Sequence, residues 1–189
     1  MNEQPIISFD SSACFREWLA RHHAGHPGIW IQIAKKASGI HSVTYAEAVE
    51  EALCHGWIDG QRKSFDATSF LQKFTPRGKR SIWSKVNVGH VTRLEKEGRM
   101  TPAGLAAAAA AKADGRWEAA YHSSRTAEMP GDFIAALDRE PDARAFFETL
   151  NKTQRYPFFF RITTAKKAET RSRRIADFVS MLKRGETLR

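Results

Sequence analysis

The sequence has little cysteine and no long apolar run. Cys14 and Cys54 are the only cysteines in 189 residues, too few for a disulfide framework of the kind found in small secreted proteins. No segment approaches the roughly 20 apolar residues that a membrane-spanning helix needs, so we predict no membrane span. The first ten residues include Glu3 and Asp10 and lack the basic and then apolar pattern of a signal peptide. We therefore expect a cytoplasmic protein with two reduced thiols.

The sequence also lacks the short motifs that mark common catalytic sites. G-x-S-x-G, H-E-x-x-H, C-x-x-C and the two glycine-rich phosphate-binding patterns are all absent. His22 and His26 stand four residues apart, but a glycine and a proline interrupt the helix, and a zinc site needs three or four converging ligands. Cys54 and His55 are adjacent and point about 100° apart on a helix, which does not favour a nucleophile–base pair. We therefore predict no catalytic residue, metal site or cofactor.

Positive charge is abundant and unevenly distributed. The formal net charge is +9, and two basic blocks, residues 61–99 and 151–189, alternate with two acidic ones, residues 1–60 and 100–150. If the basic blocks share a face, an anionic partner is expected. A solvated basic surface, or ion pairs between the blocks, is the alternative.

The first 121 residues have the mixed periodicity of an α+β domain. Phe15, Trp18 and Leu19 recur at helical spacing, and Thr44 with Glu47 forms a capping-box signature. The predicted elements are a helix from about Ser11 or Ser12 to Ala24, a strand at 29–35, a helix at 44–56, two strands at 57–62 and 69–75, and two helices at 81–97 and 101–113. We expect the strands to form a small antiparallel sheet of about three strands covered by helices. Glu47, Glu50 and Glu51 are expected to face water.

The remaining residues predict a second, helical and basic domain over 122–189. Residues 120–132 mix small and polar side chains without periodicity, as a linker does. Helices are expected at 133–138, 141–150, 156 to about 167, and about 169–183, with Pro157 in the first turn of the third because proline is unfavourable in a helix interior. The predicted fold is therefore α+β, mainly helical, with its sheet in the N-terminal part.

One ligand-binding site is predicted in the N-terminal domain. Asp59 lies on a predicted strand, and Ser81 is predicted to start a helix directly after a run of cations, an arrangement that favours anion binding. The predicted residues are Trp57, Asp59, Arg62, Arg77, Ser81, Trp83 and Asn87. A cross-strand ion pair at Asp59, with Trp83 in the core and the cations on a solvated loop, is the structural alternative. An undescribed enzyme centred on Asp59, with His55 as a second group, is a further hypothesis.

A basic cluster near the C-terminus raises the alternative of nucleic-acid binding. Five cations straddle a predicted junction between two helices: Lys166, Lys167, Arg171, Arg173 and Arg174. Such a cluster is suited to phosphate contacts, although no recognised nucleic-acid-binding motif accompanies it.

Four segments resemble the YdeI/OmpD-associated family, whose members are described as bacteriocin-protection proteins. They are residues 44–60 (TYAEAVEEALCHGWIDG), residues 74–77 with 81–87 (FTPR and SIWSKVN), residues 98–104 (GRMTPAG) and residues 165–175 (AKKAETRSRRI). The resemblance implies a stress-resistance role without an agreed catalytic residue. We therefore expect a non-catalytic protein of this type that binds an anionic or small-molecule partner.

Overall fold

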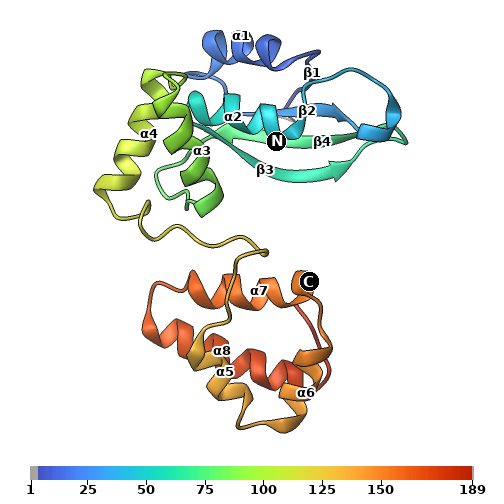
Figure 1. Cartoon of the computed structure of the whole chain (residues 1–189), viewed down its shortest axis with the longest axis vertical. Coiled ribbons are helices and arrows are strands. Elements are labelled where there is room, and N and C mark those ends of the chain that lie inside the picture. Colours follow the sequence, from blue (N-terminus) through green and yellow to red (C-terminus); the bar gives the residue numbers. More distant parts are fainter. Residues whose placement is uncertain (1–3, 189) are drawn as a thin grey trace. The chain divides into compact units, whose positions relative to one another are not determined.

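The computed structural model describes residues 4–188, which divide into two compact units. The N-terminal unit runs through Trp83 and includes Asn87–Ala120, and the C-terminal unit contains Ser84–Val86 and the chain from Tyr121 onward. Figure 1 shows the first unit in blue to yellow-green and the second in yellow to red. Among these described residues, no helix is long and apolar enough to cross a membrane.

The two units differ in secondary structure. The elements up to residue 113 are β1 (Ile6–Ser8), α1 (Ser12–His22), β2 (Ile29–Ala34), the 3-10 helix η1 (Lys36–Ser38), α2 (Tyr45–Cys54), β3 (Trp57–Ser64), β4 (Ser69–Pro76), α3 (Lys85–Lys96) and α4 (Pro102–Ala113). The C-terminal unit contains α5 (Gly131–Leu137), α6 (Pro141–Thr149), α7 (Lys152–Thr163) and α8 (Ala168–Lys183). The mainly helical α+β class is therefore confirmed.

The sheet differs in detail from the prediction of about three antiparallel strands. It has four strands in the order β1-β2-β4-β3; β4 pairs antiparallel with both β2 and β3, whereas β1 pairs parallel with β2. β1 has only three residues, too few to show an alternating pattern in the sequence. The sheet is therefore mixed, and its added edge strand was missed.

The inner face of the sheet carries the core of the N-terminal unit. Ile29, Ile31 and Ile33 alternate inward along β2 and are at most 2% exposed. Phe15 and Leu19 of α1 belong to the same buried cluster, together with the apolar side of α2. Burial of the alternating apolar side chains therefore fixes which face of β2 lies under the helices.

The structure confirms the capping box of α2 but corrects one of its exposed positions. Thr44 and Glu47 exchange the two capping hydrogen bonds, and Gly56, at φ +73°, follows the helix in a conformation that favours glycine. Glu51, expected to face water, is only 2% exposed. Two arginines outside α2 bind its carboxylate, so a contact that helical periodicity cannot reveal determines its burial.

The segment before α3 is not helical, contrary to the prediction of a helix beginning at Ser81. The side chain of Ser81 accepts a hydrogen bond from the backbone N–H of Gly78, which forms a turn instead of a helix cap. Trp83 is buried, and its ring centroid lies 4.8 Å from that of Trp117. Helix α3 begins only at Lys85. Burial of Trp83 against another aromatic ring therefore outweighs local helix propensity here.

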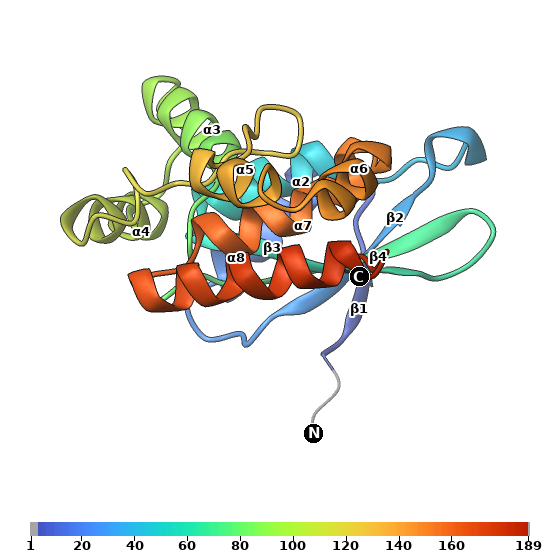
Figure 2. The ribbon, with the colours of Figure 1, turned by 90° about the horizontal axis from the view of Figure 1, so that it is seen from below.

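The C-terminal unit is a small helical bundle with a phenylalanine-rich core. Helix α8 packs against α5, α6 and α7 (Figure 2). Asn151 and Gln154 form a capping box at the start of α7, so this helix begins earlier than predicted. Pro157 consequently lies inside the helix and not in its first turn. The capping interactions and the burial of Phe158 outweigh the hydrogen bond that proline cannot make.

Candidate anion-binding pocket

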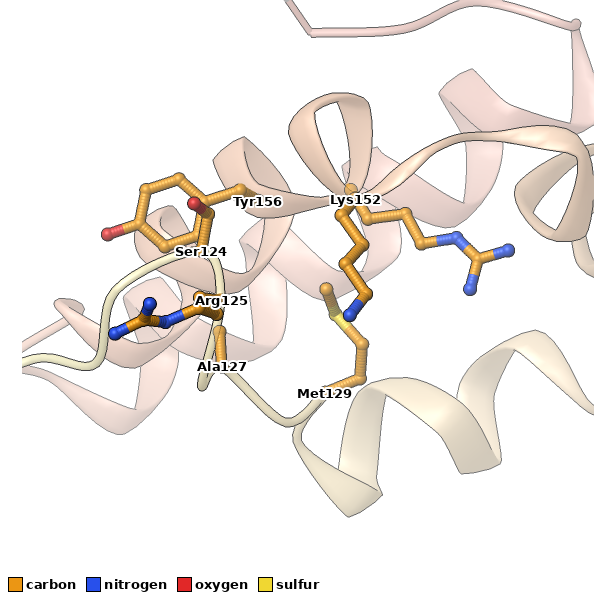
Figure 3. A pocket seen from close by; sticks show the side chains of 7 residues that line it. Ser124, Arg125, Ala127, Met129, Lys152 and Tyr156 are labelled. Carbon is orange, nitrogen blue, oxygen red and sulfur yellow. The ribbon is translucent and has the colours of Figure 1, made fainter.

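A pocket of about 260 Å³ lies in the C-terminal unit, between the start of α7 and the segment that leads into α5. Its lining includes Ser124, Arg125, Met129, Lys152 and Tyr156, which Figure 3 labels. Arg155 also lines the pocket. Lys152, Arg155 and Tyr156 are spaced i, i+3 and i+4, which places them on one side of α7. In Figure 3 the side chains of Lys152 and Met129 point toward each other across the pocket.

The charge of the pocket lining is uniformly positive. Arg125, Lys152 and Arg155 contribute cations, and the lining contains no aspartate or glutamate. The side chains of Arg125 and Lys152 make no hydrogen bond or ion pair to any residue from 4 to 188. Lys152 is also the first residue of α7, where the helix dipole favours an anion. The pocket is therefore suited to negatively charged groups.

Arg155 is held in place by contacts to its own unit. Its Nη2 donates a hydrogen bond of 2.7 Å to the carbonyl oxygen of Glu148, and its guanidinium lies 4.9 Å from the ring centroid of Phe147. Its Nε is buried and has no hydrogen-bond partner within the described chain. The guanidinium is therefore positioned by its own unit, and its Nη1 has no hydrogen-bond partner among residues 4–188.

Tyr156 connects the two walls of the pocket. Its hydroxyl donates a hydrogen bond of 3.0 Å to the carbonyl oxygen of His122, which precedes the loop carrying Ser124 and Arg125. Burial, and secondarily the nearby Tyr121, raise the pKa of Tyr156 above its ordinary value. The phenol therefore stays protonated and keeps this hydrogen bond at neutral pH.

Arg171, predicted as part of a nucleic-acid-binding cluster, instead connects two helices. Its Nε and Nη2 donate hydrogen bonds of 2.7 and 2.8 Å to the two carboxylate oxygens of Asp132, and its Nη1 donates to the carbonyl oxygen of Ile162. The Arg171 hydrogen bonds and charge hold the pKa of Asp132 below its ordinary value. Most of the hydrogen-bonding capacity of Arg171 is therefore used within the C-terminal unit.

The other four cations of that cluster fall into two groups. Arg174 donates a hydrogen bond to the carbonyl oxygen of Arg161. The side chains of Lys166, Lys167 and Arg173 are exposed and have no partner among residues 4–188. Three of the five predicted residues therefore remain available to a ligand.

Three predicted ligand-binding residues of the N-terminal unit lie on β3 and make separate contacts. Trp57 is buried, and its indole N–H donates to a backbone carbonyl directly after α1. Asp59 accepts a hydrogen bond of 2.7 Å from the hydroxyl of Tyr45 and forms no ion pair in the described part of the chain. The guanidinium of Arg62 lies 3.7 Å from the ring centroid of Phe70.

The other predicted residues lie after β4. The guanidinium of Arg77 lies 3.6 Å from the ring centroid of Trp83 and donates a hydrogen bond to the carbonyl oxygen of Ile82. Ser81 closes the turn described above, and Asn87 lies in the first turn of α3. The structure thus brings Arg77, Ser81 and Trp83 together, whereas Arg62 lies farther along the β-hairpin.

The pocket residues Arg125, Lys152 and Arg155 were missing from the sequence prediction. The i, i+3 and i+4 spacing of Lys152, Arg155 and Tyr156 would have predicted that these side chains share one face of a helix if α7 had been predicted to begin at Lys152. Arg125 lies in an irregular segment, and no sequence periodicity connects it to α7. Among residues 4–188, no group of three or more His, Cys, Asp or Glu is arranged to hold a metal ion.

The two cysteines differ sharply in exposure, and this difference predicts their reactivity. Cys14 is exposed and Cys54 is buried. Burial, and secondarily the charge of Glu51, raise the pKa of Cys54 to about 11, and only a thiolate reacts readily. Iodoacetamide at neutral pH is expected to add one carbamidomethyl group to the native protein and two in urea, as measured by intact mass spectrometry. Rapid double labelling of the native protein would contradict this assignment.

The fold and the pocket define a two-unit protein in which an α+β unit is joined to a helical unit with a cationic pocket. Residues 7–107 match a family described as Domain of unknown function (DUF8412), and residues 126–185 match a family described as Bacteriocin-protection, YdeI or OmpD-Associated. The chain therefore belongs to the first family, whose model covers more than half of it, and its C-terminal part is similar to the second family. Searches of curated proteins and of solved structures found no match.

These matches refine the resemblance seen in the sequence. The resemblance to the YdeI/OmpD-associated family is confirmed at residues 126–185, which include the basic segment 165–175. The three segments between residues 44 and 104 fall within the other matched family. Lys152, Arg155 and Tyr156 lie inside the YdeI/OmpD-associated region, and Arg125 immediately precedes it.

Proposed function

We propose that this protein is a non-catalytic cytoplasmic binding protein whose C-terminal unit holds a small molecule by an anionic group, such as a phosphate monoester. The observation that carries the proposal is a pocket lined by three cations and no carboxylate, in which two of the cations have no partner among residues 4–188. The description of the family that matches residues 126–185 refers to bacteriocin protection. This description supports a role in stress resistance for the protein when its ligand is bound.

The size and chemistry of the pocket narrow the ligand. At about 260 Å³, it lies at or just below the lower end of ordinary small-molecule sites, so it suits the charged end of a ligand better than a large ligand as a whole. The planar guanidinium groups of Arg125 and Arg155 match the oxygens of phosphate, while Lys152 supplies a compact positive charge. A doubly charged phosphate monoester fits this lining better than a neutral ligand.

Charge reversal at Lys152 tests the proposal. Inorganic pyrophosphate is the probe, titrated by isothermal calorimetry at constant ionic strength. Lys152→Glu is expected to weaken binding roughly tenfold or more, because it places a like charge in the site. The variant should fold normally, since Lys152 is exposed and a glutamate in the first turn of a helix interacts favourably with the helix dipole.

Lys166→Glu is the matched control because it changes the net charge equally at an exposed lysine outside the pocket. It is expected to retain pyrophosphate affinity within about twofold, because exposed distant charges are screened by salt. Equal losses in the two variants, or no binding to the wild-type protein, would contradict the proposal. Binding of a single-stranded oligonucleotide that is lost in Lys166→Glu and kept in Lys152→Glu would instead support the nucleic-acid alternative.

A further inference from the structure

A second pocket lies entirely within the N-terminal unit. It measures about 460 Å³ and is lined by Arg16 and Ala20 of α1, Glu51 of α2, His55, and Arg99 and Thr101 of the connection between α3 and α4. Arg16, Glu51, His55 and Arg99 contribute four ionisable groups, none of which belongs to the C-terminal pocket. All of the lining falls in the region matched by the family of unknown function.

The carboxylate of Glu51 is fixed in the floor of this pocket. The Nε and Nη2 atoms of Arg16 each donate a hydrogen bond of 2.8 Å to its two oxygens, and Nη2 of Arg99 adds one of 2.9 Å. Burial pushes the pKa of Glu51 upward, but the hydrogen bonds and charges of the two arginines outweigh it and hold that pKa below its ordinary value. Glu51 therefore remains ionised and fixes the position of both guanidinium groups.

Both guanidinium groups retain hydrogen-bond donors. Arg16 uses Nε and Nη2 on Glu51, so its Nη1 has no acceptor in the described part of the chain. Arg99 uses Nη1 on Glu50 and Nη2 on Glu51, which leaves its Nε without an acceptor there. The pocket therefore presents two positioned cationic donors to an anionic oxygen.

His55 supplies a group of the opposite kind, a hydrogen-bond acceptor in the pocket lining. Its side chain is 5% exposed, and its Nδ1 lies 2.9 Å from the backbone carbonyl oxygen of Glu51. A carbonyl oxygen only accepts, so Nδ1 carries the proton. Burial lowers the pKa of His55, so the ring is neutral at neutral pH. Its Nε2 is then an acceptor without a partner among residues 4–188.

The two remaining lining residues, Thr101 and Ala20, contribute little to ligand recognition. The hydroxyl of Thr101 donates a hydrogen bond of 2.7 Å to the carbonyl oxygen of Cys54 and accepts one from the N–H of Gly104, so it already serves the backbone. Ala20 is apolar. The lining carries two positive charges and one negative charge, and Glu50, outside the lining, also binds Arg99, so the site suits a ligand with no more than one negative charge.

We infer that this pocket is a binding site for a small organic monoanion that carries a hydroxyl group next to its acidic group, as a 2-hydroxycarboxylate does. The carboxylate of the ligand accepts hydrogen bonds from Arg16 and Arg99. The neighbouring hydroxyl donates to Nε2 of His55, an acceptor that has no hydrogen-bond partner among residues 4–188. Each polar group of such a ligand therefore meets a group of opposite hydrogen-bonding character.

Lactate and propionate form a matched pair of probes because they differ only in the hydroxyl group. Titration of the full-length protein is followed by long-range proton–nitrogen NMR of the histidine rings. Lactate is expected to shift the Nε2 resonance of His55 and to bind roughly tenfold more tightly than propionate, because propionate has no hydroxyl group to donate to this nitrogen. Equal affinities, an unshifted His55 resonance, or no lactate binding at tens of millimolar would overturn the inference.

Two variants separate the roles of the pocket groups. His55→Phe is expected to remove the preference for lactate over propionate, and Arg16→Lys to weaken both ligands to a similar degree by losing the planar guanidinium. Arg21→Lys, an exposed arginine of the same helix outside the pocket, is the control for Arg16→Lys. A variant of Arg16 that binds lactate as the wild type does would contradict the assignment. Lys152→Glu should leave lactate binding unchanged, so this result and the test of the C-terminal pocket can fail separately.

Discussion

Replacing Gly104 with alanine is expected to lower the free energy of unfolding of the N-terminal unit by about 3 kcal/mol. A Cβ at this position of α4 would lie 2.2 Å from the carbonyl oxygen of Cys54. That oxygen cannot move freely, because it accepts hydrogen bonds from the backbone N–H and the hydroxyl of Thr101. The added Cβ therefore clashes with a fixed backbone carbonyl, and this cost exceeds the gain of about 1 kcal/mol in helix propensity that alanine brings.

Gly89→Ala is the matched control for this prediction. Gly89 also lies inside a helix, α3, but a Cβ there would meet nothing within 4 Å. This variant is expected to gain about 0.5–1 kcal/mol, because alanine loses less conformational entropy on folding than glycine. Urea unfolding measured by tryptophan fluorescence reports on the N-terminal unit, because all five tryptophans lie in it, at positions 18, 30, 57, 83 and 117. Shifts of both midpoints in the same direction would show that the close approach at Gly104 is absent.

Phe158→Ala is expected to cost the C-terminal unit about 3–5 kcal/mol. The ring is fully buried, and its centroid lies 5.3 Å from that of Phe178 and 6.2 Å from those of Phe133 and Phe147. Its removal leaves a cavity at the point where α5, α6, α7 and α8 meet. A small domain has a total stability of only about 5–15 kcal/mol, so this one change removes a large part of it.

Hydrogen–deuterium exchange with mass spectrometry measures this loss in the correct unit. Amides of α5 to α8 are expected to exchange faster in Phe158→Ala, because the free energy of opening falls with global stability. Phe65→Ala is the control, since Phe65 is 49% exposed in the loop between β3 and β4 and its truncation should change stability by no more than about 0.5 kcal/mol. Unchanged protection of α7 and α8 in Phe158→Ala would contradict the assigned core.

Elements defined by local signals were predicted well. The capping box at Thr44 and the Thr101-Pro102 pair start α2 and α4 as expected, because a cap involves residues only three apart in the sequence. The strand β2 was also clear, since its apolar side chains alternate. Strand β1 was missed because three residues carry no period, and pairing with β2 alone makes them a strand.

The candidate pockets were harder to predict because each combines segments far apart in the sequence. Glu51 was assigned to the solvent side of α2 by helical periodicity alone. Arg16, 35 residues earlier, and Arg99, 48 residues later, instead bury its carboxylate. Arg125 likewise joins Lys152 only through the folding of an irregular segment against α7. No local sequence pattern predicts either of these contacts between distant segments.

The sequence by itself determined the α+β class, the helix caps, the strand alternation and the resemblance to the YdeI/OmpD-associated family, because all of these depend on residues near one another in the chain. The tertiary structure alone decided that β1 joins the sheet, that Trp83 packs on Trp117 instead of starting a helix, and that Glu51 and His55 line a pocket with two arginines. The physical reason is that burial and charge pairing between distant segments can outweigh local propensity, and both depend on where the whole chain places each side chain.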